Sequence, residues 1–205
     1  MDGSVPSIDQ CLALIERYEM LGNIRRHSII VARVAHTLVD NLMMDGTNEV
    51  EPPPLDLVLA GALLHDIAKT ECLDGSCLHA DRGREICEAH GYQEIGLIVG
   101  DHVILSSFHP EKYRRGLFPA REIVYYSDKR VKHEDIVSLP ERLEYIIERY
   151  SDGSDRINRR IKENFNTCRE LEEYLFRFLP FSPDELTEHV CNTFFEPVKN
   201  STVPE

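Results

Sequence analysis

The chain has 205 residues, of which 42% are hydrophobic and 29% are charged. This composition excludes a wholly disordered chain and is sufficient for one packed core without help from disulfides. The formal net charge of -13 argues against broad nucleic-acid binding, because that affinity comes mainly from phosphate contacts. A small anionic substrate remains compatible with it, since a pocket can be locally positive on an acidic protein.

Hydrophobic residues recur with a helical period along most of the chain, and no segment shows the alternation typical of a strand. We therefore predict an all-α fold, with a single helical domain over residues 1–196 and a loose tail over 197–205. The metal-site core is expected at about 24–132 and the C-terminal helices at 139–196. The predicted helices cover residues 8–21, 24–44, 55–69, 79–90, 92–105, 120–131, 139–150, 154–178 and 183–195.

The six cysteines form no CxxC pair, and the polar N-terminus shows no secretory signal. No apolar stretch approaches the length of about 18 to 20 residues that a membrane helix needs. We therefore predict a cytoplasmic protein without a membrane span, in which Cys72 and Cys77 are free, dispensable thiols. A zinc site at these two cysteines is disfavoured because no further cysteine pair accompanies them.

Side chains that commonly bind metals recur at apolar positions of the predicted helices. A single histidine there is more often a core residue with a satisfied hydrogen bond, but a buried carboxylate needs a partner. Two such carboxylates coexist with four histidines, and cations of matching burial are few, so we predict a metal centre. The predicted metal ligands are His27, His65, Asp66, His79, His102 and Asp128.

The adjacent pair His65-Asp66 is the most informative part of this set. Neighbouring side chains on a helix diverge by about 100°, so both can reach one ion only if it lies in the notch between them. Gly61 and Ala62, one turn earlier, are small enough to leave room there. Lys69 lies four residues after His65 and should overhang the same edge.

In chain order, this set resembles the HD-domain superfamily of metal-dependent phosphohydrolases. The resemblance covers about residues 24–132 and rests on His27, on the doublet in LLHDIAK and on the aspartate in YYSDKRV. The histidines of HADRG and GDHVI resemble the additional ligands of two-metal members. The cyclic-di-GMP phosphodiesterase branch is not supported, because no paired histidine occurs at His102 and no glycine-tyrosine-proline signature follows.

The resemblance implies one or two divalent ions (Fe, Mn, Co, Ni, Zn or Mg) and attack of metal-activated water or hydroxide on phosphorus. Asp66 and Lys69 are the expected catalytic residues, and the expected substrate is a small phosphate ester, a nucleotide or a dinucleotide. One alternative is a di-iron oxygenase on the same ligands. Another is a non-catalytic binding or regulatory module, which the complete ligand set disfavours. Homo-oligomer formation stays open.

A basic and aromatic segment follows His102 and leads back toward Asp128, so both its ends should lie near the centre. Its arginines are suited to bidentate phosphate binding, and Phe108, Tyr113 and Phe118 are candidates for stacking on a base. The alternative is a solvated surface loop, as for most charge runs. The predicted substrate-binding residues are Arg26, Arg82, Arg114 and Arg115.

Overall fold

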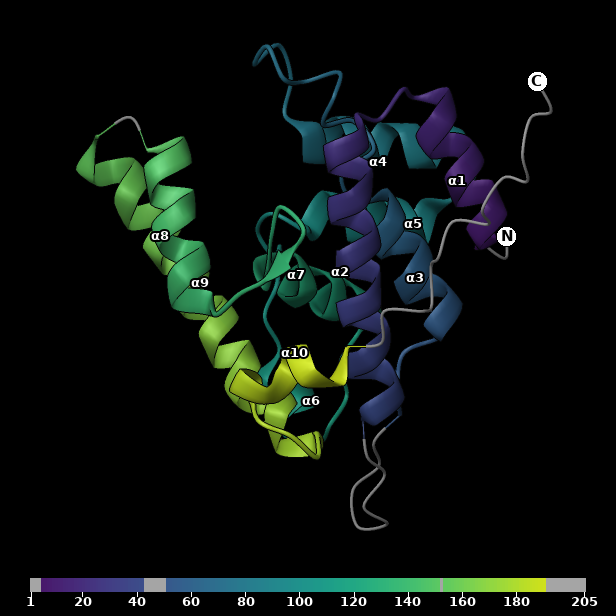
Figure 1. Cartoon of the computed structure of the whole chain (residues 1–205). Coiled ribbons are helices and arrows are strands. Elements are labelled where there is room, and N and C mark those ends of the chain that lie inside the picture. Colours follow the sequence, from purple (N-terminus) through teal and green to yellow (C-terminus); the bar gives the residue numbers. More distant parts are fainter. Residues whose placement is uncertain (1–4, 43–50, 152, 191–205) are drawn as a thin grey trace, which may run out of the picture.

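The computed structural model describes residues 5–42, 51–151 and 153–190. Within these ranges the chain is helical apart from one short two-stranded ribbon, which confirms the all-α prediction (Figure 1). The elements are α1 (Ile8–Arg17), α2 (Gly22–Asn41), α3 (Leu55–Leu64), α4 (His79–Ala89), α5 (Gln93–Asp101), α6 (Pro110–Tyr113), α7 (Ala120–Lys129), β1 (Val131–Lys132), β2 (Asp135–Ile136), α8 (Leu139–Tyr150), α9 (Asp155–Leu175), two 3₁₀ turns (Phe176–Phe178 and Pro183–Glu185) and α10 (Leu186–His189).

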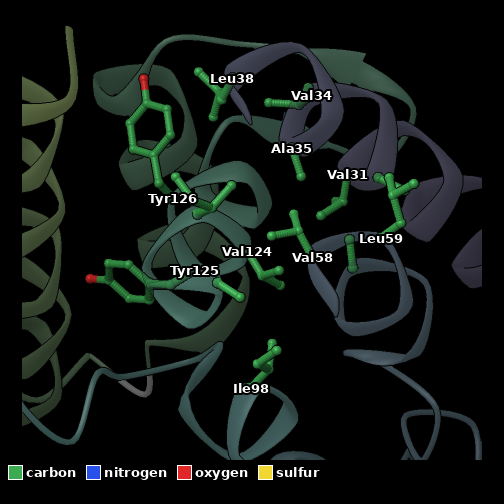
Figure 2. Packing of buried hydrophobic residues seen from close by; sticks show 14 of the residues in the cluster. Val31, Val34, Ala35, Leu38, Val58, Leu59, Ile98, Val124, Tyr125 and Tyr126 are labelled. Carbon is green, nitrogen blue, oxygen red and sulfur yellow. The ribbon is translucent and has the colours of Figure 1, made fainter. Parts of the chain in front are cut away.

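The core lies where α2, α3, α5 and α7 pack together (Figure 2). Gly61 allows α3 and α5 to approach closely, because a Cβ atom there would lie 2.7 Å from Cγ2 of Ile98. We expected this small residue to leave room for an ion, but it makes room for a neighbouring helix instead. The tight packing fixes the helix ends that carry the ligand-type side chains.

The helix ends follow local sequence signals at some positions and depart from them at others. Ser7 caps α1, which begins at residue 8 as predicted: its hydroxyl accepts from the backbone N–H of Gln10, whose side chain accepts from the N–H of Ser7. α3 ends at Leu64, five residues before the predicted end. The chain then continues in turns with three-residue hydrogen bonds, the N–H of Lys69 donating to the carbonyl of Asp66 at 2.9 Å. The doublet therefore lies just beyond the helix.

An antiparallel ribbon follows α7, although we expected no strand. β1 and β2 pair Val131 with Ile136 and Lys132 with Asp135, and His133 at the turn has a positive φ of 57°. Strands of two residues are too short to show an alternating pattern, so the sequence carried no signal for them. The ribbon turns the chain back toward α2.

The loop between α3 and α4 contains a disulfide between Cys72 and Cys77, so the prediction of two free thiols is wrong. A tight turn brings the two Cα atoms to 5.1 Å: the N–H of Gly75 donates to the carbonyl of Cys72, and Gly75 has a φ of +79°. The pairing removes one argument for a cytoplasmic location, because disulfides are rare in reducing compartments.

The helices α8 and α9 form an antiparallel hairpin that stands to one side of the core (Figure 1). Within α9 the buried side chains begin only at Phe165, so the tip half of the hairpin is less covered than its base. The predicted last helix is shorter than expected and is split into a 3₁₀ turn and α10. The predicted end of this helix, at residue 195, and the predicted tail over 197–205 lie outside the described residues. Among the described helices, none combines the length and apolar character needed to cross a bilayer.

Candidate metal centre

The structure brings all six predicted ligand residues together where five helices meet. His27 lies on α2, Asp128 lies on α7, and His79 is the first residue of α4. The doublet directly follows α3, and His102 directly follows α5. Five of the six are buried, whereas the His79 side chain is 30% exposed and faces the opening of the cluster.

Two groups of three residues have ligand atoms close enough to hold an ion, and they share Asp66. In the first group, Nε2 of His65 lies 3.4 Å from Oδ2 of Asp66, and His27 completes the group. In the second, Oδ1 of Asp66 lies 3.4 Å from Nε2 of His79 and 3.5 Å from Nε2 of His102. The two carboxylate oxygens of Asp66 thus face different groups.

Asp128 adjoins the first group from the α7 side. Its Oδ1 lies 3.1 Å from Nε2 of His27 and 3.8 Å from Nε2 of His65. The carboxylate is buried and lies opposite the doublet. The first group and Asp128 together therefore present two imidazole nitrogens and two carboxylates to one point.

Backbone carbonyls orient three of the four imidazole rings. Nδ1 of His27 lies 3.0 Å from the carbonyl oxygen of His133. Nδ1 of His65 lies 2.7 Å from the carbonyl oxygen of Ala62, and Nδ1 of His102 lies 2.6 Å from that of Val99. A carbonyl oxygen only accepts, so each Nδ1 carries a proton, and each Nε2 is the atom that can present a lone pair to a metal ion once it is unprotonated. This is the arrangement that a metal-binding histidine needs.

Two further observations support the fit of this donor set to a divalent metal ion. Nε2 of His65 and Oδ1 of Asp66 are buried without a hydrogen-bond partner, which is costly for polar atoms. Nε2 of His79 and Nε2 of His102 lie 3.2 Å apart, within hydrogen-bond distance of each other and close enough for both to reach one ion. A cation would satisfy all of these atoms, and a nitrogen and oxygen set without thiolate suits borderline to hard ions.

The partly buried Lys69 and the buried Lys129 keep both carboxylates ionised. Nζ of Lys69 lies 2.7 Å from Oδ2 of Asp66, and Nζ of Lys129 lies 2.9 Å from Oδ2 of Asp128. Burial alone would raise the pKa of each aspartate, but Lys69 and then His65 hold that of Asp66 well below its usual range. For Asp128, Lys129 and then His27 have the same effect. Our expectation that buried cations would be few is therefore wrong, and the fit rests on the unpaired atoms instead.

The second group is poised to bind as neutral imidazole. Burial, and then the neighbouring His102, lowers the pKa of His79 to about 4, so this ring is uncharged at neutral pH. Burial also lowers the pKa of His102. A neutral imidazole is the form that donates its lone pair to a metal.

The HD-domain family matches residues 24–131, more than half of the chain, and the match encloses all six residues of the cluster. The chain belongs to the HD-domain family. We call the matched region the HD core. It begins near the start of α2 and ends at β1, so the hairpin of α8 and α9 lies outside it.

The chain is also similar to a protein described as a tRNA (cytidine(56)-2'-O)-methyltransferase from Picrophilus torridus. The two are 28% identical over 181 residues, which cover 82% of this chain and 50% of that relative. The chain thus spans about half the length of the relative it matches. No solved structure matches the chain.

Two cations at the HD centre were absent from our predictions. Lys129 is 5% exposed and also donates from Nζ to the carbonyl of His102 at 2.8 Å. Arg142 on α8 is 6% exposed, and its Nη2 lies 3.7 Å from Oδ1 of Asp128. Adjacency to Asp128 could have drawn attention to Lys129. Nothing local marks Arg142, because it comes from a helix outside the HD core.

The four predicted substrate-binding arginines lie away from the two cavities beside the centre. Several of them are paired with glutamates at the surface, and Arg115 also has an interaction partner. Of the five cationic residues expected near the site, which are Lys69 and these four arginines, only Lys69 lines the cavities. The ion pairs are Arg26 with Glu134 at 2.6 Å, Arg82 with Glu71 at 2.9 Å and with Glu85 at 3.1 Å, and Arg114 with Glu111 at 2.9 Å.

The aromatic residues of the same segment belong to the protein interior. Tyr113 and Phe118 are buried and stacked on each other, with ring centroids 5.6 Å apart. The Tyr113 hydroxyl donates to Oε1 of Glu122 at 2.9 Å, and Phe108 packs edge-on against the Tyr113 ring. Burial therefore contradicts the expectation that Tyr113 and Phe118 stack on a substrate, whereas stacking by the partly buried Phe108 stays a prediction. These rings join the segment to α7 and α9.

Proposed function

We propose that this HD-domain protein is a metal-dependent phosphohydrolase that acts on a small phosphate ester. The observation that carries the proposal is the position of Asp66, which is shared by two groups of candidate ligands and has one oxygen unpaired. The family match supports a metal-dependent hydrolase in general. The phosphate ester, nucleotide or dinucleotide, is our more specific proposal.

In this proposal, Asp66 bridges two sites. His27, His65 and Asp128 complete the first, and His79 with His102 completes the second. Divalent ions held there would lower the pKa of a water molecule and neutralise charge on a phosphoryl group. Lys69, fixed against Asp66, would stabilise negative charge on an oxygen of the reacting phosphate.

The charge around the centre supports an anionic ligand. Three cations, Lys69, Lys129 and Arg142, face two carboxylates, Asp66 and Asp128, when the histidines are neutral. Three positive and two negative charges give a net charge of plus one before any metal is counted. The surroundings of the site therefore differ in sign from the whole chain, which carries -13.

The size of the space beside the centre supports a small substrate. Two cavities of about 320 and 410 Å³ flank the cluster and share Asp66, Lys69, Arg142 and Tyr150 along their walls. These volumes are at the lower end of the range of about 300–1,000 Å³ that is usual for small-molecule pockets. A polymeric substrate would have to place a single end or residue there.

The methyl transfer named for the Picrophilus torridus relative is not part of the proposal. Half of that protein has no counterpart in this chain, and the net charge argues against an extensive RNA surface. We retain a single domain over residues 1–196 and a cytoplasmic location as predictions. Limited proteolysis that released a stable fragment ending near residue 135 would contradict the single domain.

The test combines metal analysis with an activity screen. Protein prepared without chelator should contain between about one and two equivalents of transition metal, as the donor set implies. It should hydrolyse at least one member of a panel of nucleotides, dinucleotides and sugar phosphates with added Mn²⁺, Co²⁺ or Ni²⁺. Iron-dependent oxygen consumption without hydrolysis would instead identify the oxygenase alternative. A folded protein that contains metal but shows neither activity would identify the non-catalytic module.

A further inference from the structure

The cavity of about 320 Å³ has two chemically different walls. The HD core contributes the metal-ligand cluster and two lysines on one side. The hairpin of α8 and α9, whose place is seen in Figure 1, forms the other side. Apolar side chains from both helices line it together with Arg142, Arg160 and Asn164. These apolar residues are Ile146, Ile157, Ile161 and Phe165.

Arg142 stands where these two walls meet, and it lines both cavities. It is buried, and its guanidinium carbon lies 5.3 Å from the centre of the Tyr145 ring. Its Nε has no hydrogen-bond partner, and its contact to Asp128 is long at 3.7 Å. A buried guanidinium with an unsatisfied N–H is unfavourable unless a ligand supplies an acceptor.

The two lysines of the centre are more fully engaged than Arg142. Lys129 donates to Asp128 and to the carbonyl of His102, and Lys69 donates to Asp66 at 2.7 Å. A guanidinium also matches the geometry of a phosphate better than an ammonium does, because two N–H groups can donate in parallel. Of the three cations that contact the two aspartates, Arg142 is therefore the one best placed to accept a new anionic partner.

The apolar wall indicates what the rest of the ligand is. Ile146, Ile157 and Ile161 are only partly buried, so they retain apolar surface that a ligand can cover. Ile104, after α5, lines the same cavity and is 50% exposed. Apolar surface next to a charged site is suited to a molecule with an anionic end and an aromatic or aliphatic body.

We propose that the hairpin of α8 and α9 selects the substrate: Arg142 binds the phosphoryl oxygens, and the isoleucine wall packs against an aromatic or aliphatic organic group of the same molecule. This inference rests on the proposed function for the identity of the anionic end. It assigns selectivity to a part of the chain that lies outside the HD core.

The test uses inert phosphonates, so it does not depend on turnover. Binding of phenylphosphonate and methylphosphonate to the metal-loaded full chain is measured by titration calorimetry. The wild-type protein should bind phenylphosphonate at least about 10-fold more tightly, because only the phenyl group can cover the apolar wall. Equal affinities would overturn the assignment of that wall.

Two kinds of variant separate the contributions. Arg142→Met should weaken both phosphonates by about 10- to 100-fold, the range for a lost charged hydrogen bond, and Arg142→Lys should recover part of the loss. Ile157→Gln should weaken phenylphosphonate by about 5- to 10-fold and leave methylphosphonate unchanged. Arg84→Met and Leu97→Gln are the controls, because Arg84 pairs with Glu88 and neither position lines the cavities.

Metal content is measured for every variant. Unchanged phosphonate binding by Arg142→Met with full metal content would overturn the proposal. Loss of metal by both Arg142 variants would assign Arg142 to holding Asp128 and would also overturn it. If the binding pattern is found but no phosphate ester is hydrolysed, the ligand-selecting role stands and the proposed hydrolase function fails.

Discussion

The HD core and the C-terminal hairpin hold their cavity-facing side chains in different ways. In the core, packed helices bury five of the six ligand residues, and backbone carbonyls orient the rings of His27, His65 and His102. In the hairpin, no side chain among the described residues from 143 to 164 is buried. Rigid placement is needed for metal coordination, whereas a less tightly packed wall can adapt to a ligand. This difference in packing is what we expect if, as we propose, the HD core carries the chemistry and the hairpin selects the substrate.

The largest effect should come from Asp66, the residue shared by both groups of ligands. Asp66→Ala should lower phosphatase activity at least about 1,000-fold, because both groups of ligands lose their shared carboxylate and the effect should be larger than that of losing a single charged contact. Metal content should fall below one equivalent, as measured by elemental analysis.

Asp66→Asn keeps the side-chain shape and should lose activity in the same way, which guards against a folding defect. Asp81→Ala, at an exposed position of α4, is the matched control and should behave as wild type. Full activity in Asp66→Asn would show that Asp66 does not belong to a catalytic metal centre, and it would contradict the contrast that we draw between the HD core and the hairpin.

A change in the second group should have a narrower effect. His79→Ala removes a ligand-type side chain that contacts Asp66 only at Oδ1, so His27, His65 and Asp128 stay in place. We expect the metal content to fall from about two equivalents to about one, with a large loss of activity. If His79→Ala retains both its full metal content and its activity, the centre holds one ion in the first group.

The packing of the two regions can be compared by making one substitution in each and measuring the change in the free energy of unfolding. Gly61→Ala places a methyl group 2.7 Å from Ile98, so it should lower the free energy of unfolding by about 1–3 kcal/mol. Ile157→Ala, in the hairpin, should lower it by less than about 1 kcal/mol because the side chain is only partly buried. Urea unfolding measures both. An equal or larger loss for Ile157→Ala would show that the hairpin is packed as firmly as the core.

The smallest effect on the centre should come from the disulfide loop. Cys72→Ser removes a disulfide that closes only a short loop, and a short loop constrains the unfolded chain little. The free energy of unfolding should therefore fall by no more than about 2 kcal/mol, while metal content and activity stay unchanged. Mass spectrometry of the unreduced wild-type protein should show this pair oxidised, and reductant should reproduce the stability of the variant. A loss of metal in Cys72→Ser would make the loop part of the centre.

Much of the fold was predictable because helices follow local rules. The boundaries of α8 match the prediction, and α9 begins at Asp155, one residue after the predicted start, with Ser154 as its cap. The six ligand-type residues also lie together as expected, since a helical period of 3.6 residues determines which side chains share a face. That they bind metal stays a prediction.

The sequence by itself determined the all-α class and the ligand-bearing faces, because each depends on residues close together in the chain. It also determined membership in the HD-domain family, because the ligand residues recur there in a fixed order along residues 24–131. Only the tertiary structure decided which distant groups complete the site. The carbonyl of His133 orients His27, and Arg142 reaches Asp128 from another helix. The same holds for Gly61, whose missing side chain makes room for Ile98 rather than for an ion. Contacts between segments far apart in sequence leave no periodic signal, since they depend on how whole helices pack.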